Sequence, residues 1–120
     1  MILSDQAILD SIELREIVIE PFSRESLGTN SYDVHLSKHL ATYTDEVLDA
    51  NKHNPIKRFE IGEEGFVLDP GITYLGSTLE YTETHKHVPF LEGKSSIGRL
   101  GIDIHATAGK GDVGFCNHWT

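Results

Sequence analysis

The densest group of reactive side chains lies in residues 91–120, where serines, lysines, an arginine, a histidine and an aspartate alternate with glycines. Ser95 and Arg99 are four residues apart, so one helical turn would place them on the same side. A turn entered through Gly93 would also direct free backbone N–H groups toward an anion. The pattern suits an anionic, polar ligand. A serine–arginine pair beside glycines, however, more often belongs to a surface loop that binds no ligand.

Charge and composition limit the class of ligand. The 120 residues include 10 basic and 19 acidic side chains, a net charge of −9. This charge argues against non-specific binding to nucleic acid or to an acidic membrane, so a few local cations would have to hold an anionic nucleotide. Cys116 is the only cysteine, which excludes an internal disulfide and fits a reducing compartment. The N-terminal residues have no basic region and no long apolar run, so we expect neither a signal peptide nor a membrane span, and we expect a cytoplasmic protein.

Short elements separated by turns must position these side chains. Ser4 is a candidate N-cap for a helix over residues 5–13, because apolar residues follow it at helical spacing. The β-branched run at 17–22 predicts a strand, and the alternation within 31–43 predicts a half-buried one. Further apolar or alternating runs, which predict short strands, lie at the ends of 45–61, on both sides of the turn at 69–71, at 88–91 and at 100–106. The whole pattern is typical of an all-β barrel or jelly roll with an N-terminal helix.

Three other patterns carry less weight. Residues 109–114 match G-x-G-x-x-G without a following helix, and the Gly93–Ser95 run resembles a P-loop end but has Val88 where that motif needs glycine. His85 and His87 would share one face of an extended segment, yet no third metal ligand has suitable spacing, which favours a structural role. The histidine and cysteine signature of zinc deaminases is absent, so deamination here would use no catalytic zinc.

The runs GKSSIGRLG at 93–101, HATAG at 105–109 and GDVGF at 111–115 resemble, in order and spacing, the signature of the dCTP deaminases. These enzymes are the deaminating branch of the dUTPase-like superfamily. The resemblance implies a distorted jelly roll or β-barrel with a short N-terminal helix, in a single domain over 1–120. It implies zinc-independent hydrolytic deamination of dCTP to dUTP and ammonia, which supplies the dUTP and dTTP precursor route. It also implies a homotrimer with sites between subunits, and Mg²⁺ carried on the triphosphate.

The resemblance also assigns roles to the first motif. Ser95 and Arg99 are expected to be catalytic, facing the pyrimidine and the water that attacks it. Lys94 and Ser96 are expected to contact phosphates. Relatives more often have arginine where Lys94 stands, and lysine keeps the charge but loses the bidentate geometry. Lys110 matches a basic position near the phosphates, where it could serve a neighbouring subunit.

The later motifs are expected to bind the sugar and the base. Asp112 would accept a hydrogen bond from the deoxyribose 3′-hydroxyl, and Phe115 would stack under the sugar and exclude a ribose 2′-hydroxyl. Thr107 and Ala108 align with a strand beside the base, which relatives also use when dTTP inhibits them. His105 belongs either to that strand's binding surface or to the core.

Two departures from the family pattern affect the expected activity. Val113 replaces the usual proline of the sugar-binding turn, and the glutamate that acts as general base aligns just past Thr120. We therefore expect a C-terminally truncated domain with strongly reduced deaminase activity. The EGKSS run at 92–96 leaves open a bifunctional enzyme that converts dCTP to dUMP. The sequence is also compatible with a non-catalytic nucleotide-binding module or with a β-domain whose motif has decayed.

Overall fold

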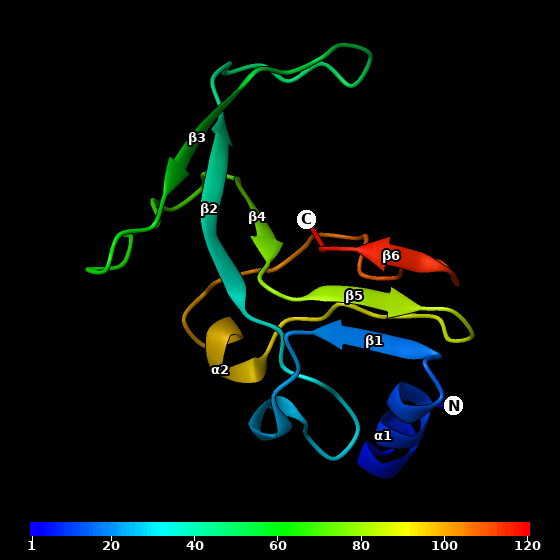
Figure 1. Ribbon diagram of the computed structural model, residues 1–120. Helices are drawn as coiled ribbons and strands as arrows, with labels where there is room; N and C mark the ends of the chain where they lie inside the picture. Colours follow the sequence, from blue (N-terminus) through cyan, green and yellow to red (C-terminus); the bar gives the residue numbers. More distant parts are fainter. The chain divides into compact units, whose positions relative to one another are not determined.

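Strands dominate the computed structural model, which describes residues 1–120 (Figure 1). The elements are α1 (Asp5–Glu13), β1 (Ile17–Glu20), the 3-10 turn η1 (Arg24–Ser26), β2 (Leu36–Tyr43), β3 (Ile56–Glu60), β4 (Tyr74–Thr78), β5 (Tyr81–Thr84), α2 (Ser95–Gly98) and β6 (Phe115–Asn117). They form two three-stranded sheets, ordered β1-β5-β6 and β3-β2-β4, in which all pairs are antiparallel. The expected all-β class with a short N-terminal helix is confirmed.

The elements belong to two compact units, each assembled from separate stretches of chain. The first unit comprises Met1–Tyr32 and Tyr81–Asn117, and the second comprises Asp33–Glu80 and His118–Thr120. Sheet β1-β5-β6 and both α-helices lie in the first unit, and sheet β3-β2-β4 lies in the second. The chain therefore passes between the units at 32–33, at 80–81 and at 117–118.

Helix α1 occupies the residues that the sequence predicts. Ser4 is its N-cap, and the Ser4 hydroxyl oxygen accepts a hydrogen bond from the Ala7 amide at 3.2 Å. Ile8 is buried and, with Ile17 of β1, provides the apolar core of the first unit. No helix in the structure combines the length and the hydropathy that crossing a membrane requires.

Strand β5 is the central strand of the first sheet, with β1 on one side and β6 on the other (Figure 1). Thr82 and Thr84 are buried on one face of β5. Because side chains alternate along a strand, Glu83 projects from the opposite face. The β5–β6 register places Glu83 directly opposite Cys116.

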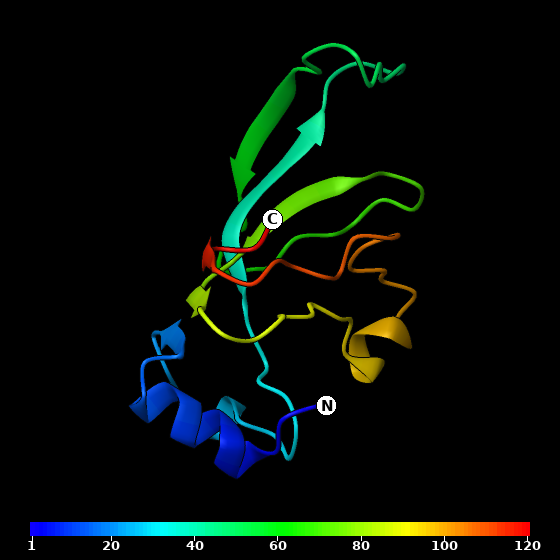
Figure 2. The same ribbon diagram turned by 90° about the vertical axis from the view of Figure 1, so that its right-hand side faces the viewer.

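Strand β2 is the central strand of the second sheet and curves along its length (Figure 2). Its register against β4 shifts between Leu36 and Leu40, an irregularity of the kind that bends a strand. Leu40 and Ala41 are the buried apolar residues of this unit. A Cβ on Gly76 would lie 2.8 Å from the side chain of the exposed Leu36 and 3.1 Å from that of the buried Leu40, so a larger residue there would require both leucines to shift.

The strand predicted over 31–43 is too long at its start, because β2 begins at Leu36. Before that point the Gly28 amide donates to the Ser31 carbonyl, which turns the chain. The His35 amide then donates to the Glu80 carboxylate at 2.8 Å rather than to a strand carbonyl. Regular pairing therefore cannot start earlier.

Four other predicted strands do not form. At the start of 45–61, residues 45–50 are irregular and pair with no strand. Residues 100–106 are irregular, because Gly101 adopts φ +77° at the end of α2 and the segment finds no partner strand. The run at 88–91 contributes one isolated bridge, between Phe90 and Lys110. The apolar residues before the turn at 69–71 are also unpaired, although the turn itself forms.

Candidate functional site

Ser95 and Arg99 lie on one short helical turn, as their spacing predicts. Helix α2 begins after Lys94, which is its N-cap, and Arg99 is its C-cap. The Ile97 amide donates to the Lys94 carbonyl at 2.9 Å, and the Arg99 amide donates to the Ser95 carbonyl at 3.0 Å. One turn of helix therefore separates the hydroxyl from the guanidinium, and both project from the same side.

The α2 segment presents its polar side chains to solvent. The residues of this segment with an expected nucleotide role, all exposed, are Lys94, Ser95, Ser96 and Arg99. The first amide that donates within the turn is that of Ile97, so the amides of Ser95 and Ser96 precede the intrahelical hydrogen bonds. The segment thus offers cationic groups, hydroxyls and amides at an open surface, a combination that suits a phosphorylated ligand.

Backbone pairing brings Lys110 to the segment that leads into α2. The Leu91 amide donates to the Gly109 carbonyl at 2.7 Å, and the Gly111 amide donates to the Pro89 carbonyl at 2.9 Å. Lys110 lies between these two hydrogen bonds and is exposed. The pairing therefore joins the end of the HATAG segment to the residues that lead into α2.

His105 packs within this pairing. Its Nε2 lies 2.8 Å from the Leu91 carbonyl oxygen, which can only accept, so Nε2 is protonated and donates. A Cβ on Gly109 would lie 2.6 Å from the same nitrogen. His105 Nδ1 is buried and has no hydrogen-bond partner in the chain. These contacts match the core alternative for His105.

The GDVGF run forms a tight turn. The Phe115 amide donates to the Asp112 carbonyl at 3.1 Å, and Gly114 adopts φ +88°. Val113 therefore occupies the second position of the turn, where proline is favoured. The Gly114 amide also donates to the Thr84 carbonyl, which fixes the turn to the end of β5. Asp112 is exposed, and Phe115 is half-buried as the first residue of β6.

The remaining predicted residues are less closely connected. Thr107 and Ala108 are exposed and lie just before the pairing with the α2 segment. No hydrogen bond or ion pair joins Arg99 to Asp112. The structure therefore connects the α2 segment with Lys110 by main-chain pairing, and the turn at Asp112 with β5.

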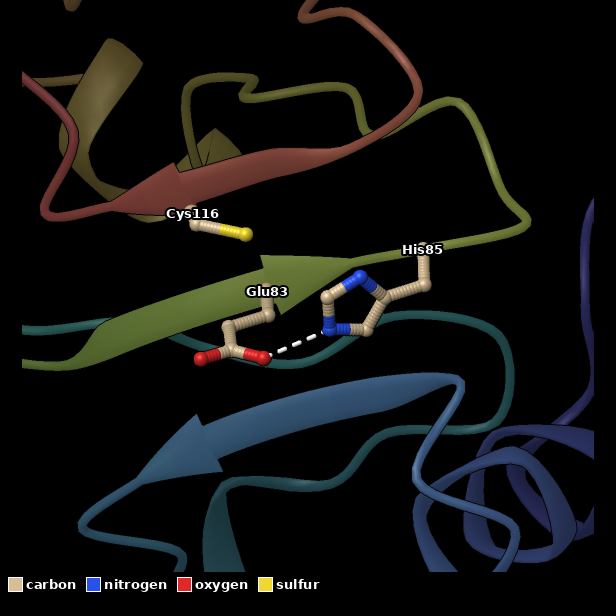
Figure 3. A group of neighbouring side chains, drawn as sticks. All are labelled: Glu83, His85 and Cys116. Atoms are coloured by element: carbon tan, nitrogen blue, oxygen red, sulfur yellow. Dashed lines mark hydrogen bonds and ion pairs between the residues drawn. The ribbon is translucent and has the colours of Figure 1, made fainter.

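A second polar cluster comprises Glu83, His85 and Cys116 (Figure 3). The two-residue spacing places Glu83 and His85 on one face of an extended segment. Sequence spacing does not reveal Cys116 as their neighbour, because only the β5–β6 register places it opposite Glu83. His87 does not join the cluster, since its Nε2 lies 3.3 Å from the Ser11 hydroxyl. The hydrogen bond from His85 is the main cause that lowers the pKa of Glu83 below its ordinary value.

The chain is similar to a family of nucleotide enzymes over almost all of its length. The sequence pattern of the dCTP deaminase-like family matches residues 2–120. A protein of Clostridium acetobutylicum named dCTP deaminase, dUMP-forming, is 57% identical over the whole chain, which covers 69% of that relative. Proteins with the same name from Cytophaga hutchinsonii and Leptospira biflexa are 51% and 50% identical, again over the whole chain, which covers 69% and 68% of them.

These relatives correct the expected product. The expected main reaction, deamination of dCTP to dUTP, is wrong, because the similar proteins are named as dUMP-forming. The bifunctional alternative, suggested by the EGKSS run at 92–96, fits better. The EGKSS run is the sequence feature that pointed to this product.

The family pattern over residues 2–120 also agrees with the two antiparallel sheets and the N-terminal helix, which confirms the dUTPase-like type of all-β fold. The three motifs, the fold and the similarity over the full chain lead to one conclusion: this protein belongs to the dCTP deaminase-like family.

Proposed function

We propose that this protein acts in the conversion of dCTP to dUMP, with release of ammonia and pyrophosphate. In this reaction one water replaces the amino group at C4 of the cytosine, and another cleaves the bond between the α- and β-phosphates. The observation that carries the proposal is the similarity over the whole chain to proteins named dCTP deaminase, dUMP-forming, at 57% identity in the Clostridium acetobutylicum relative.

Ser95 and Arg99 are proposed to orient the pyrimidine and the attacking water. Their position on one turn, with both side chains exposed, lets a hydroxyl and a guanidinium approach one ligand from the same side. General acid–base catalysis of the water attack also requires a carboxylate that takes and returns the proton. Neither Ser95 nor Arg99 supplies a carboxylate, so their proposed part is binding and orientation.

Lys94, Ser96 and Lys110 are proposed to hold the phosphates. The lysines supply positive charge. The pairing of residues 89–91 with 109–111 connects their two segments, which supports binding of one phosphate chain by both lysines. Ser96 and Glu92 are exposed and carry oxygen atoms, which are the ligands that Mg²⁺ prefers. Mg²⁺ is commonly bound together with the phosphates of a substrate. The segment therefore fits a magnesium–triphosphate, in which the ion neutralises phosphate charge.

Asp112 and Phe115 are proposed to select deoxyribose. A carboxylate that accepts from the 3′-hydroxyl and a ring under the sugar together reject ligands that lack the donor or carry an extra oxygen. Thr107 and Ala108 are proposed to line the base, where dTTP would compete with dCTP. The exposed Asp112 carboxylate at the start of a fixed turn supports this role.

Calorimetric binding of dCTP with Mg²⁺ tests these roles. We expect dCTP to bind more tightly than CTP, and dTTP to compete with it. Asp112→Asn should weaken binding of dCTP, because its carboxylate accepts from the 3′-hydroxyl. Phe115→Ala should reduce the preference for dCTP over CTP, and Arg99→Gln should weaken binding of both. Asp103→Asn is the matched control, since Asp103 is exposed in the same region and has no proposed role.

Chromatography of the same samples identifies the product. Formation of dUMP and pyrophosphate would support the proposal, whereas dUTP as the end product would overturn the dUMP-forming reaction. Equal effects of Asp112→Asn and Asp103→Asn would overturn the sugar-binding role of Asp112. Saturable binding of dCTP without any product would support the non-catalytic nucleotide-binding module instead.

A homotrimer with sites between subunits forms part of the proposal. Several large apolar side chains near the proposed site are exposed, including Phe90 at 65%, Leu100 at 72% and Val113 at 54%. Such side chains are commonly covered by another chain. Sedimentation should therefore give the mass of three 13.4 kDa chains, and a single-chain mass at all concentrations would overturn the trimer.

A further inference from the structure

Strands β5 and β6 pair in a register that places Glu83 directly opposite Cys116. Residues opposite each other project from the same face of a sheet, and His85 follows Glu83 at the two-residue spacing that returns to that face. The carboxylate oxygen, the imidazole nitrogen and the sulfur all lie within 4.8 Å of one another. Figure 3 shows Glu83 and His85 turned toward each other, with Cys116 on the neighbouring strand.

We propose that Glu83, His85 and Cys116 bind a divalent transition-metal ion, with Zn²⁺ as the best-suited ion. Zinc accepts sulfur, nitrogen and oxygen ligands together, whereas Mg²⁺ takes oxygen ligands and avoids thiolates. The site is separate from the Mg²⁺ that accompanies a nucleotide, because it uses none of the residues proposed to hold phosphates.

The distances agree with a tetrahedral ion after a small adjustment. With metal–ligand bonds of about 2.0–2.3 Å, neighbouring ligand atoms of a tetrahedral zinc site lie roughly 3.3–3.8 Å apart. Glu83 Oε2 and His85 Nε2 are 2.6 Å apart and share a proton. The ion would replace this proton, which moves to His85 Nδ1 so that the ring stays neutral. It would separate the two atoms slightly, while the sulfur approaches from β6.

The charges also match the ion. A Cys116 thiolate and a Glu83 carboxylate together neutralise a divalent cation, with His85 as a neutral third ligand. The Cys116 thiol now donates to the Gly114 carbonyl at 3.3 Å, so binding would release that proton to solvent. Because His85 and Cys116 are exposed, an ion can enter and a water can occupy a fourth position.

Neighbouring groups hold two of the ligands in place. The Tyr81 hydroxyl donates to Glu83 Oε1 at 2.9 Å, which leaves Oε2 directed at His85. The His85 amide donates to the Glu16 carbonyl at 2.9 Å, which fixes the backbone of the second ligand. Such supporting hydrogen bonds are typical of metal sites, where their loss weakens binding.

A bound ion would connect β5 to β6 by side chains as well as by main-chain hydrogen bonds. Strand β6 directly follows the turn that begins at Asp112, so the ion would also restrain that turn. A ligand that binds only the folded state stabilises it, and added zinc should raise the thermal unfolding temperature.

Cobalt absorption of the metal-free protein is the first test. Cys116 is the only thiol, so a sulfur-to-cobalt charge-transfer band reports it directly. We expect the band to saturate at one ion per chain, to disappear on addition of Zn²⁺, and to be absent in Cys116→Ser. In competition with a chromophoric chelator, Glu83→Gln and His85→Gln should each weaken Zn²⁺ binding by at least about tenfold.

His87→Gln is the matched control, since His87 is two residues away and contacts Ser11 instead. It should leave Zn²⁺ affinity unchanged, and an equal loss in His87→Gln and His85→Gln would overturn the assignment. Absence of the sulfur band in the wild-type chain, or saturation at half an ion per chain, would do the same. Should Cys116→Ser fail to fold, alkylation of Cys116 in the folded wild-type protein should abolish the band; an unchanged band would also overturn the site.

Discussion

At the scale of single residues, Gly109 has no room for a side chain. A Cβ there would lie 2.5 Å from the Leu91 carbonyl oxygen and 2.6 Å from His105 Nε2. Both groups are held by hydrogen bonds of the same pairing, so neither can move without breaking it. Gly109→Ala should lower the free energy of unfolding by about 1–3 kcal/mol, measured by urea denaturation.

Gly98→Ala provides the matched control, because an added Cβ there meets no atom within 4 Å. Alanine is also the better helix former, so this change should leave the free energy of unfolding unchanged or raise it slightly. A similar loss in both variants would contradict the steric explanation for Gly109.

Asp49, in the loop between β2 and β3, should titrate below its ordinary pKa of 3.8. The Asn51 amide donates to its carboxylate at 2.9 Å, and this hydrogen bond is the main cause that lowers the pKa, followed by Lys52. Because the folded-state pKa is lower than the unfolded one, the carboxylate stabilises the loop above pH 3.8, and this contribution is lost as the pH falls through the lowered value.

The amide chemical shift of Asn51 followed against pH measures this effect. The midpoint should lie below 3.8, and Lys52→Met should move it upward without restoring it fully. A midpoint at or above the ordinary value in the wild-type protein would show that the loop hydrogen bonds do not persist in solution.

Residue spacing predicted the local part of the site and not the distant part. Ser95 and Arg99 lie within one turn, so the sequence alone indicated their shared side. Glu83 and Cys116 meet only through the β5–β6 register, which is a contact between distant segments. For the product, the EGKSS run at 92–96 indicated the dUMP-forming reaction only as an alternative.

At the scale of elements, the helix and the turns were predicted correctly because their signals are local. Ser4 caps α1, and glycines at positive φ form the turns at Gly71 and Gly114. Strand limits were less accurate, because a strand exists only where another strand pairs with it. Residues 100–106 alternate like a strand but lack a partner, whereas the short β6 forms because β5 offers an edge.

The turn from Asp112 to Phe115 leads to a prediction at this scale. Val113 is at its second position, where the fixed φ of proline suits the turn, and the Val113 amide makes no hydrogen bond in the chain. Val113→Pro should raise the free energy of unfolding by about 0.4–1 kcal/mol, because it restricts the unfolded chain. Thermal and urea unfolding measure the change.

Gly114→Ala should have the opposite effect, since it places a side chain at φ +88°. A loss of stability in Val113→Pro would mean that the turn differs from the one described. The result would also weaken the proposed position of the Asp112 carboxylate.

At the scale of the whole molecule, Glu80 lies beside one of the points where the chain passes between the units. Its side chain is 2% exposed and accepts hydrogen bonds from the His35 amide at 2.8 Å and from His35 Nδ1 at 2.6 Å. The Thr78 amide donates to the Trp119 carbonyl at 2.9 Å, and the Trp119 amide donates to the Thr78 hydroxyl at 3.0 Å. These bonds join the start of the 33–80 stretch to its end, and that end to the 118–120 stretch of the second unit.

Glu80→Ala would leave the His35 amide without its acceptor. We expect a loss of roughly 1–3 kcal/mol in the free energy of unfolding, because both lost hydrogen bonds end on the buried carboxylate and hydrogen bonds to a charged group are the stronger ones. Glu80→Gln keeps one acceptor and should lose less. Glu46→Ala, at an exposed position, is the control for removal of a glutamate and should have little effect; equal losses at both positions would contradict the role of the buried carboxylate.

The order in which the chain visits the two units affects how it would respond to cleavage. A single cut in the largely exposed loop at 45–55 would leave β1 and β2 on one fragment and β3 to β6 on the other. Because β1 pairs with β5 and β2 pairs with both β3 and β4, each fragment supplies strands to both sheets. The two fragments would therefore remain associated without a covalent link, and a protease that reached this loop would nick the protein without dismantling it.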